Sequence, residues 1–219
     1  MHLKTEIRGV IFDLDGVIVS TDEYHYQAWQ KLADQEGIYF DRLINQRLRG
    51  VSRMESLEIL LERATITYGA GEKAAFAARK NAGYCELLKQ ITPGDMLPGA
   101  MALLDGLRSR KVKLAIGSSS KNTPGILAAI GLDRYFDAIA DGNNITKSKP
   151  DPEVFLKAAQ LLGLAPKHCL VVEDAAAGVE AAIAAGMRVL AVGFAADDPR
   201  ATLRASNLSD VTAGQILNT

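Results

Sequence analysis

The chain has 219 residues, 48% of them hydrophobic, and a formal net charge of −1. This composition is typical of a globular protein with a sizeable core, and the lack of a basic excess argues against nucleic acid as a partner. No apolar run is long enough to span a membrane, and the polar residues 1–8 contain no secretory signal. Free thiols at Cys85 and Cys169, both buried, are a simpler expectation than a disulfide. We therefore expect a cytoplasmic monomer.

The first predicted element is a short buried strand over residues 9–12, which are mainly β-branched or aromatic. Asp13 and Asp15 follow it, and Gly16 allows a sharp turn. Residues two apart on a strand point to the same side, roughly 7 Å apart. The two carboxylates therefore repel each other unless a metal ion or a proton intervenes. For this stretch alone, an ordinary turn with Asp13 as its side-chain acceptor is the alternative.

Residues 21–91 are predicted to be entirely helical, because no stretch among them has the period of a strand. Four helices are expected: one capped by Ser20 or Thr21 and ending near Gly37, one over residues 41–47, one with Leu57, Leu60, Leu61 and Ala64 on one side, and one over residues 72–90. We expect this block to be a cap domain inserted after the first strand.

From residue 92 onward, short apolar runs alternate with helical segments. Strands are predicted at residues 112–116, 136–140, 169–172 and 189–192, and helices at 100–110, 123–130, 152–162 and 175–185. In the polar tail we expect a helix near residues 199–205 and a short strand at 210–211. This alternation predicts an α/β fold, with helices on both faces of a parallel sheet. The predicted core domain comprises residues 1–20 and 92–219, and the cap comprises residues 21–91.

Polar side chains follow the predicted strands at several places: Asp13 and Asp15, the run from Ser118 to Asn122, Lys149 in a loop, and Glu173 with Asp174. Each alone is also typical of a loop or a helix start. Parallel strands bring their carboxyl ends to one rim, so we expect these groups to converge. Oxygen ligands without histidine or cysteine suit Mg²⁺, which often shares phosphate oxygens with carboxylates. One aspartate can then attack phosphorus while the other moves a proton.

The motifs Asp13-Leu14-Asp15-Gly16, Ser118, Lys149-Pro150 and Glu173-Asp174 resemble, in order, those of the haloacid dehalogenase (HAD) superfamily. The resemblance implies a HAD-like Rossmannoid core, with Asp13 as nucleophile and Asp15 as acid/base. It implies that Ser118 and Lys149 hold the transferring phosphate. It also implies Mg²⁺ on Asp13, the backbone carbonyl of Asp15, Glu173 and Asp174.

Further segments are similar to those of the β-phosphoglucomutases of this superfamily. They are Thr21-x-Glu23-Tyr24-His25-x-x-x-Trp29, Leu48-Arg49-Gly50-Val51-Ser52-Arg53, Arg79-Lys80-Asn81 and Ser118-x-Ser120-Lys121-Asn122. Such enzymes interconvert β-glucose 1-phosphate and glucose 6-phosphate through β-glucose 1,6-bisphosphate. The resemblance implies that the non-transferring phosphate is bound by Arg53, Ser120, Lys121 and Asn122. It implies that the sugar site is lined by Gly50, Val51, Ser52, Ser56 and Lys80, and Trp29 belongs to the same cluster of cap residues. It also implies that His25 couples cap closure to the acid/base.

A mutase must hold two phosphates and keep water from the aspartyl-phosphate, which a second cationic site and a closing cap provide. The alternative is a Mg²⁺-dependent phosphatase of small sugar or polyol phosphates, with water as acceptor. A binding protein without turnover is a third possibility, but it has no need of both Asp13 and Asp15. One departure from the family pattern is Ala175, where many relatives carry a hydroxyl residue.

Overall fold

The computed structural model describes residues 6–219, so most of the polar N-terminal segment lies outside the described residues. Its centre is a parallel six-stranded sheet of order β3-β2-β1-β4-β5-β6. The strands are β1 (Gly9–Phe12), β2 (Lys113–Gly117), β3 (Ala138–Ala140), β4 (Cys169–Glu173), β5 (Arg188–Ala191) and β6 (Leu203–Arg204). The predicted α/β class is confirmed. Because β1 lies between β2 and β4, the residue after it, Asp13, stands in the middle of the sheet's carboxyl edge.

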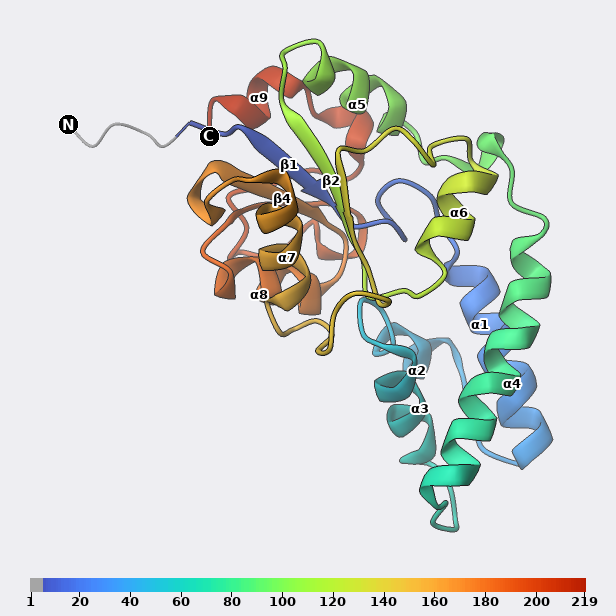
Figure 1. The fold of residues 1–219 in the computed structure, drawn as a ribbon. Coiled ribbons are helices and arrows are strands. Elements are labelled where there is room, and N and C mark those ends of the chain that lie inside the picture. The colour runs from blue at the N-terminus through green and yellow to red at the C-terminus, as the bar shows by residue number, and fades with distance from the viewer. Residues whose placement is uncertain (1–5) are drawn as a thin grey trace.

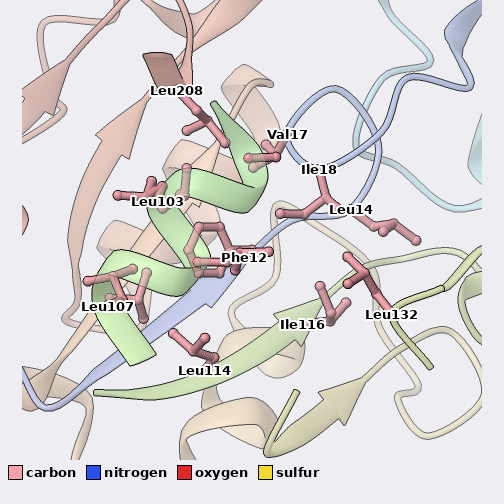
Figure 2. Packing of buried hydrophobic residues seen from close by; sticks show 14 of the residues in the cluster. Phe12, Leu14, Val17, Ile18, Leu103, Leu107, Leu114, Ile116, Leu132 and Leu208 are labelled. Atoms are coloured by element: carbon pink, nitrogen blue, oxygen red, sulfur yellow. The ribbon is translucent and has the colours of Figure 1, made fainter. Parts of the chain in front are cut away.

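Helices cover both faces of this sheet (Figure 1). They are α5 (Ala100–Arg108), α6 (Thr123–Ala129), α7 (Glu153–Leu162), α8 (Ala176–Ala184) and α9 (Ala213–Leu217), joined by short 3-10 turns η1 (Pro93–Asp95), η2 (Pro166–His168), η3 (Gly193–Ala195) and η4 (Leu208–Asp210). Phe12 packs with Leu103 and Leu107 of α5 on one face (Figure 2), whereas Ile11 packs with α7 and α8 on the other. Both faces of β1 are therefore buried, as a parallel sheet requires.

The prediction for the tail was wrong. Residues 203–204 form the edge strand β6, which pairs with β5, in place of the helix expected at 199–205. Residues 208–210 form the turn η4, where a strand was expected at 210–211, and the helix α9 follows. A strand of two residues is too short to show a periodic pattern in the sequence. It forms because it pairs with β5 at the edge of the sheet.

Four helices occupy the chain between β1 and η1: α1 (Asp22–Glu36), α2 (Arg42–Gln46), α3 (Arg53–Leu61) and α4 (Ala70–Leu88). They lie together beyond the carboxyl edge of the sheet (Figure 1). Their apolar sides pack around Trp29 and Leu57 in a hydrophobic cluster of their own. We propose that residues 21–91 form the cap on this basis.

Two local features define helix ends in this block, of which the first, Gly37, was predicted. Gly37 ends α1 in the left-handed conformation, which glycine adopts without strain. Ser52 and Glu55 form a reciprocal capping box at the start of α3.

In the described range 6–219, no helix has the length and apolar character to cross a bilayer. Cys85 and Cys169 are both free, but only Cys169 is buried, so the expectation of two buried thiols was half right.

Candidate active site

Three carboxylates converge where β1 and β4 end. Asp13, Glu173 and Asp174 are buried, and one oxygen from each lies within 4.8 Å of the others. Lys149 reaches the same place from the loop before α7, with its Nζ 2.6 Å from Asp13 Oδ1 and 2.8 Å from Glu173 Oε2. The structure therefore brings together groups that are 136 residues apart in the chain.

This cluster carries more negative than positive charge. Burial raises the pKa of Glu173 to about 7 and that of Asp174 well above its ordinary value, with Asp13 adding to both shifts. Burial lowers the pKa of Lys149, but the negative charges of Asp13 and Glu173 and the hydrogen bonds that they accept from the ammonium group have the larger opposite effect. The lysine pKa is therefore raised. A single lysine thus faces three acidic groups. A buried set of oxygen donors with this charge excess fits a hard divalent cation.

Two glycines make room for these carboxylates. A Cβ atom at Gly16, which has a φ of +78°, would overlap the Asp174 carboxylate. A Cβ atom at Gly178 would overlap the Glu173 side chain. Gly178 lies in α8, where the sequence pattern alone gave no reason for a glycine.

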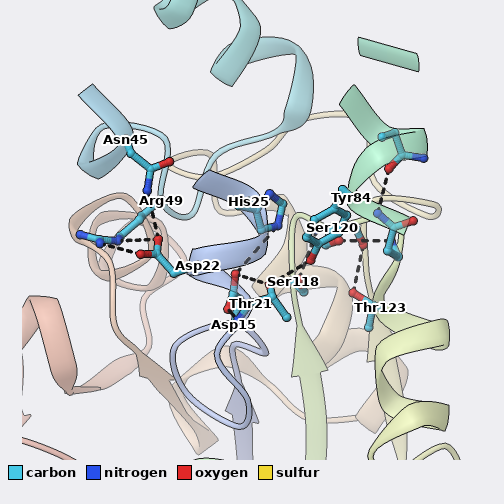
Figure 3. A network of polar contacts seen from close by, with 12 residues as sticks. Asp15, Thr21, Asp22, His25, Asn45, Arg49, Tyr84, Ser118, Ser120 and Thr123 are labelled. Carbon is cyan, nitrogen blue, oxygen red and sulfur yellow. Dashed lines mark hydrogen bonds and ion pairs between the residues drawn. The ribbon is translucent and has the colours of Figure 1, made fainter. Parts of the chain in front are cut away.

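Asp15 lies in the turn after β1 and binds Thr21. Its Oδ2 accepts a 2.7 Å hydrogen bond from Thr21 Oγ1, its Oδ1 accepts another from the Thr21 amide, and Tyr84 donates to the same hydroxyl at 2.9 Å (Figure 3). Thr21 is the N-cap of α1 by position, but its side chain makes no capping bond. Burial raises the pKa of Asp15 to about 6, although the bonds from Thr21 act against the shift. That value suits a group that must both give and take a proton near neutral pH.

The raised pKa has a consequence for stability. Between its ordinary value near 4 and about 6, Asp15 holds its proton more tightly in the folded state, so its ionisation costs stability as the pH rises. Asp15→Asn is therefore expected to melt at a higher temperature than the wild type at about pH 8. The difference in melting temperature between the variant and the wild type should shrink at about pH 5 and vanish near pH 4. Thermal melts in the presence of a chelator measure this. A variant that melts lower than the wild type at about pH 8 would contradict it.

His25 and Lys80 stand beside Asp15. Lys80 Nζ lies 2.7 Å from His25 Nδ1, and His25 Nε2 lies 3.9 Å from Asp15 Oδ2. Burial, Lys80 and Arg53 hold the pKa of His25 well below its usual range, so the ring is neutral at pH 7. Nδ1 then accepts from Lys80, and the ring proton resides on Nε2, the nitrogen that faces Asp15.

A cavity of about 980 Å³ separates the helical block from the carboxyl edge of the sheet. Most of the site residues predicted from the sequence line it: Asp13, Asp15, His25, Trp29, Gly50, Val51, Ser52, Arg53, Ser56, Lys80, Ser118, Ser120, Lys121, Asn122 and Asp174. Lys149 and Glu173 lie fully buried behind its wall and reach it through Asp13. The site also includes Thr21 and Tyr84, which the sequence analysis did not select.

Two cations of the cavity stand apart from the carboxylate cluster. Arg53 begins α3, and Lys121 lies in the loop after β2. Neither has an ion-pair partner among residues 6–219. Burial lowers the pKa of Arg53, although the value stays far above neutrality for any arginine. Within the described residues, the cavity therefore has positive charge without an ion-pair partner on both the helical block and the sheet side.

Comparisons with known proteins agree with this geometry. A model of the haloacid dehalogenase-like hydrolase family matches residues 7–186. β-Phosphoglucomutase of Bacillus subtilis is 43% identical over 208 residues, which cover 94% of this chain and 92% of that protein. A phosphorylated carbohydrates phosphatase of Thermotoga maritima is 32% identical over 97% of both chains. The crystal structure of β-phosphoglucomutase from Clostridium difficile matches with a TM-score of 0.92 and 39% identity, over 97% of this chain and 96% of that one. The chain belongs to the haloacid dehalogenase-like hydrolase family.

Proposed function

We propose that the protein is a β-phosphoglucomutase. It would isomerise β-D-glucose 1-phosphate and D-glucose 6-phosphate through β-glucose 1,6-bisphosphate and a phosphorylated Asp13. The observation that carries this proposal is a pair of cationic sites: Lys149, which binds Asp13 behind the cavity wall, and Arg53 with Lys121, which line the cavity and have no ion-pair partner among residues 6–219. A bisphosphate needs both sites, whereas a monophosphate needs only the first. The similarity to two β-phosphoglucomutases supports the same conclusion.

The roles of the residues follow from their positions. Asp13 would attack the phosphorus of a bound phosphate, and the bond from phosphorus to the sugar oxygen would break. Asp15, with a pKa of about 6, would give a proton to that oxygen and later take one from the opposite hydroxyl. Ser118 and Lys149 would hold the transferring phosphate, and Arg53, Ser120, Lys121 and Asn122 would hold the other one. The sugar would be surrounded by Trp29, Gly50, Val51, Ser52, Ser56 and Lys80.

We further propose that the cluster of Asp13, Glu173 and Asp174 binds Mg²⁺, with the backbone carbonyl of Asp15 as a further ligand. When bound, the ion would supply positive charge against both the carboxylates and the phosphate. The charge excess of the cluster and its oxygen-only donor set support this assignment. A sugar phosphate substrate also favours action in the cytoplasm, and we propose that the protein acts there as a monomer.

Addition of Mg²⁺ is expected to stabilise the fold, because the ion relieves repulsion among buried carboxylates. At a concentration of about 100 times its dissociation constant, the free energy of unfolding should rise by about 2.7 kcal/mol. Melting curves with Mg²⁺ and with a chelator measure the effect. Asp174→Asn should lose the response, while Asp22→Asn, which is outside the cluster, should keep it. Superimposable curves for the wild type would contradict the assignment.

The function is tested by supplying β-glucose 1-phosphate, Mg²⁺ and a trace of the bisphosphate. A mutase forms glucose 6-phosphate without stoichiometric release of phosphate. Phosphate release without the isomer would replace the proposal by the second candidate, a Mg²⁺-dependent phosphatase of small sugar or polyol phosphates. That candidate is kept because relatives at 32% identity carry phosphatase names. No turnover by a folded sample would favour a binding protein.

A further inference from the structure

Several contacts cross the boundary between the helical block and the core at the rim of the cavity. Ser119 donates to the Gly50 carbonyl at 3.1 Å, and the Asn122 amide donates to Asn81 at 3.0 Å. A different kind of contact joins Arg49, in the loop before α3, to Phe194 of η3. The guanidinium carbon of Arg49 lies 3.5 Å from the centroid of the Phe194 ring. Neither residue is among the proposed ligands of the two phosphates.

Arg49 is held rigidly by the helical block. Its Nε and Nη2 donate to the two carboxylate oxygens of Asp22, each at 3.0 Å, and the Asn45 amide donates to the same carboxylate at 3.4 Å (Figure 3). The Arg49 side chain is only 19% exposed. Because its edges are engaged by Asp22, the flat face of the guanidinium is available for stacking on a ring.

Phe194 comes from the core but is not a member of the two hydrophobic clusters that the described part of the core contains. Its exposed fraction is 67%, unusual for a large aromatic residue that also lines the cavity. The preceding residue, Gly193, donates to the Ser206 carbonyl at 3.1 Å and lies against Asp174. The ring is thus anchored next to the proposed metal site, and Arg49 is its polar partner from the cap.

The contact closes a side of the cavity away from the Asn122–Asn81 bond. In Figure 3, Arg49 and Asp22 lie on one side of His25, whereas Ser120 lies on the other. The helical block therefore contacts the core on more than one side of the cavity. The contacts near Ser120 include Asn122, which would also hold substrate, whereas Arg49 and Phe194 would not.

We propose that the contact between Arg49 and Phe194 is a latch that keeps the cap over phosphorylated Asp13 and so limits its hydrolysis. This inference rests on the proposed mutase function. The two residues would be positioning residues, because they touch neither phosphate. An exposed cation–π contact changes the balance between closed and open forms by about two- to fivefold. Water would reach Asp13 in proportion to the open form.

Cys85 provides a direct measure of opening. Its thiol lies 3.7 Å from Asn122 Oδ1 across the boundary and is partly buried, whereas Cys169 is fully buried. The rate at which a small thiol reagent labels Cys85 should rise about two- to fivefold in Phe194→Leu. Phe194→Tyr keeps the face of the ring and should label like the wild type. Phe194 is exposed, so both variants are expected to fold, which melting curves check.

A second measurement tests the consequence for the reaction. With β-glucose 1-phosphate as substrate, the ratio of phosphate released to glucose 6-phosphate formed should rise about two- to fivefold in Phe194→Leu and stay unchanged in Phe194→Tyr. A labelling rate in Phe194→Leu equal to that of the wild type would overturn the latch. Faster labelling with an unchanged product ratio would overturn its role against water. If the wild type formed no glucose 6-phosphate, the mutase proposal would fail, while the labelling rates would still decide whether the contact holds the cap.

Discussion

Asp13→Asn is expected to abolish phosphoryl transfer while leaving the protein folded. Asp13 is the buried carboxylate that faces both Lys149 and the cavity, and an amide cannot form the acyl phosphate. Removal of a nucleophile typically costs at least about 10⁴-fold in turnover. The formation of glucose 6-phosphate and the release of phosphate should both disappear, because the mutase and phosphatase reactions share this residue.

A matched control separates loss of chemistry from loss of fold. Asp34→Asn changes an exposed aspartate of α1 that lies outside the cavity lining and that the proposed chemistry does not use, so it should retain transfer. Melting curves show whether Asp13→Asn is folded. Repeated turnover by a pure sample of Asp13→Asn would contradict the assignment of the nucleophile.

Arg53→Ala is expected to impair isomerisation far more than hydrolysis of a simple aryl phosphate. The Arg53 guanidinium has no carboxylate partner among residues 6–219 and offers a planar fork to a second phosphate, which an aryl phosphate lacks. Truncation of one partner of a buried charged contact costs at least about 2 kcal/mol, or about 30-fold. Rates of the two reactions on the same preparation measure the difference.

A conservative substitution separates the effect of the Arg53 charge from that of its geometry. Arg53→Lys keeps the charge but loses the two-pronged geometry, so its isomerisation rate should fall between those of the wild type and Arg53→Ala. Equal losses in isomerisation and aryl phosphate hydrolysis would show that Arg53 acts through the fold or the first phosphate. The proposed second site would then be wrong.

Much of the fold could be predicted because its signals are local. Runs of apolar residues predicted five of the six strands to within about two residues, since parallel strands buried on both faces need them. Gly37 and Gly163 marked the ends of α1 and α7 because each adopts a left-handed conformation there. The strand β6 was missed because its two residues owe their conformation to pairing with β5.

In the candidate site, too, some residues could be predicted from the sequence and others depend on tertiary contacts. Asp13, Lys149, Glu173 and Asp174 could be brought together in advance because the topology of a parallel sheet dictates where strands end. Thr21 was expected as a helix cap, yet its hydroxyl donates a hydrogen bond to Asp15. This contact depends on the conformation of the turn between the two residues, which the sequence pattern does not specify. The contact between Arg49 and Phe194 joins positions 145 residues apart by number, and no motif indicates such pairs.

The proposed reaction requires that Asp13 carries the phosphoryl group during turnover. The most direct test is to mix the protein and Mg²⁺ with β-glucose 1,6-bisphosphate, quench in acid, digest, and locate the phosphate by mass spectrometry. Phosphate on the peptide that contains Asp13, absent from Asp13→Asn, is the predicted result. A sample that turns over substrate but carries the phosphate on another residue, or on none, would show that Asp13 is not the nucleophile.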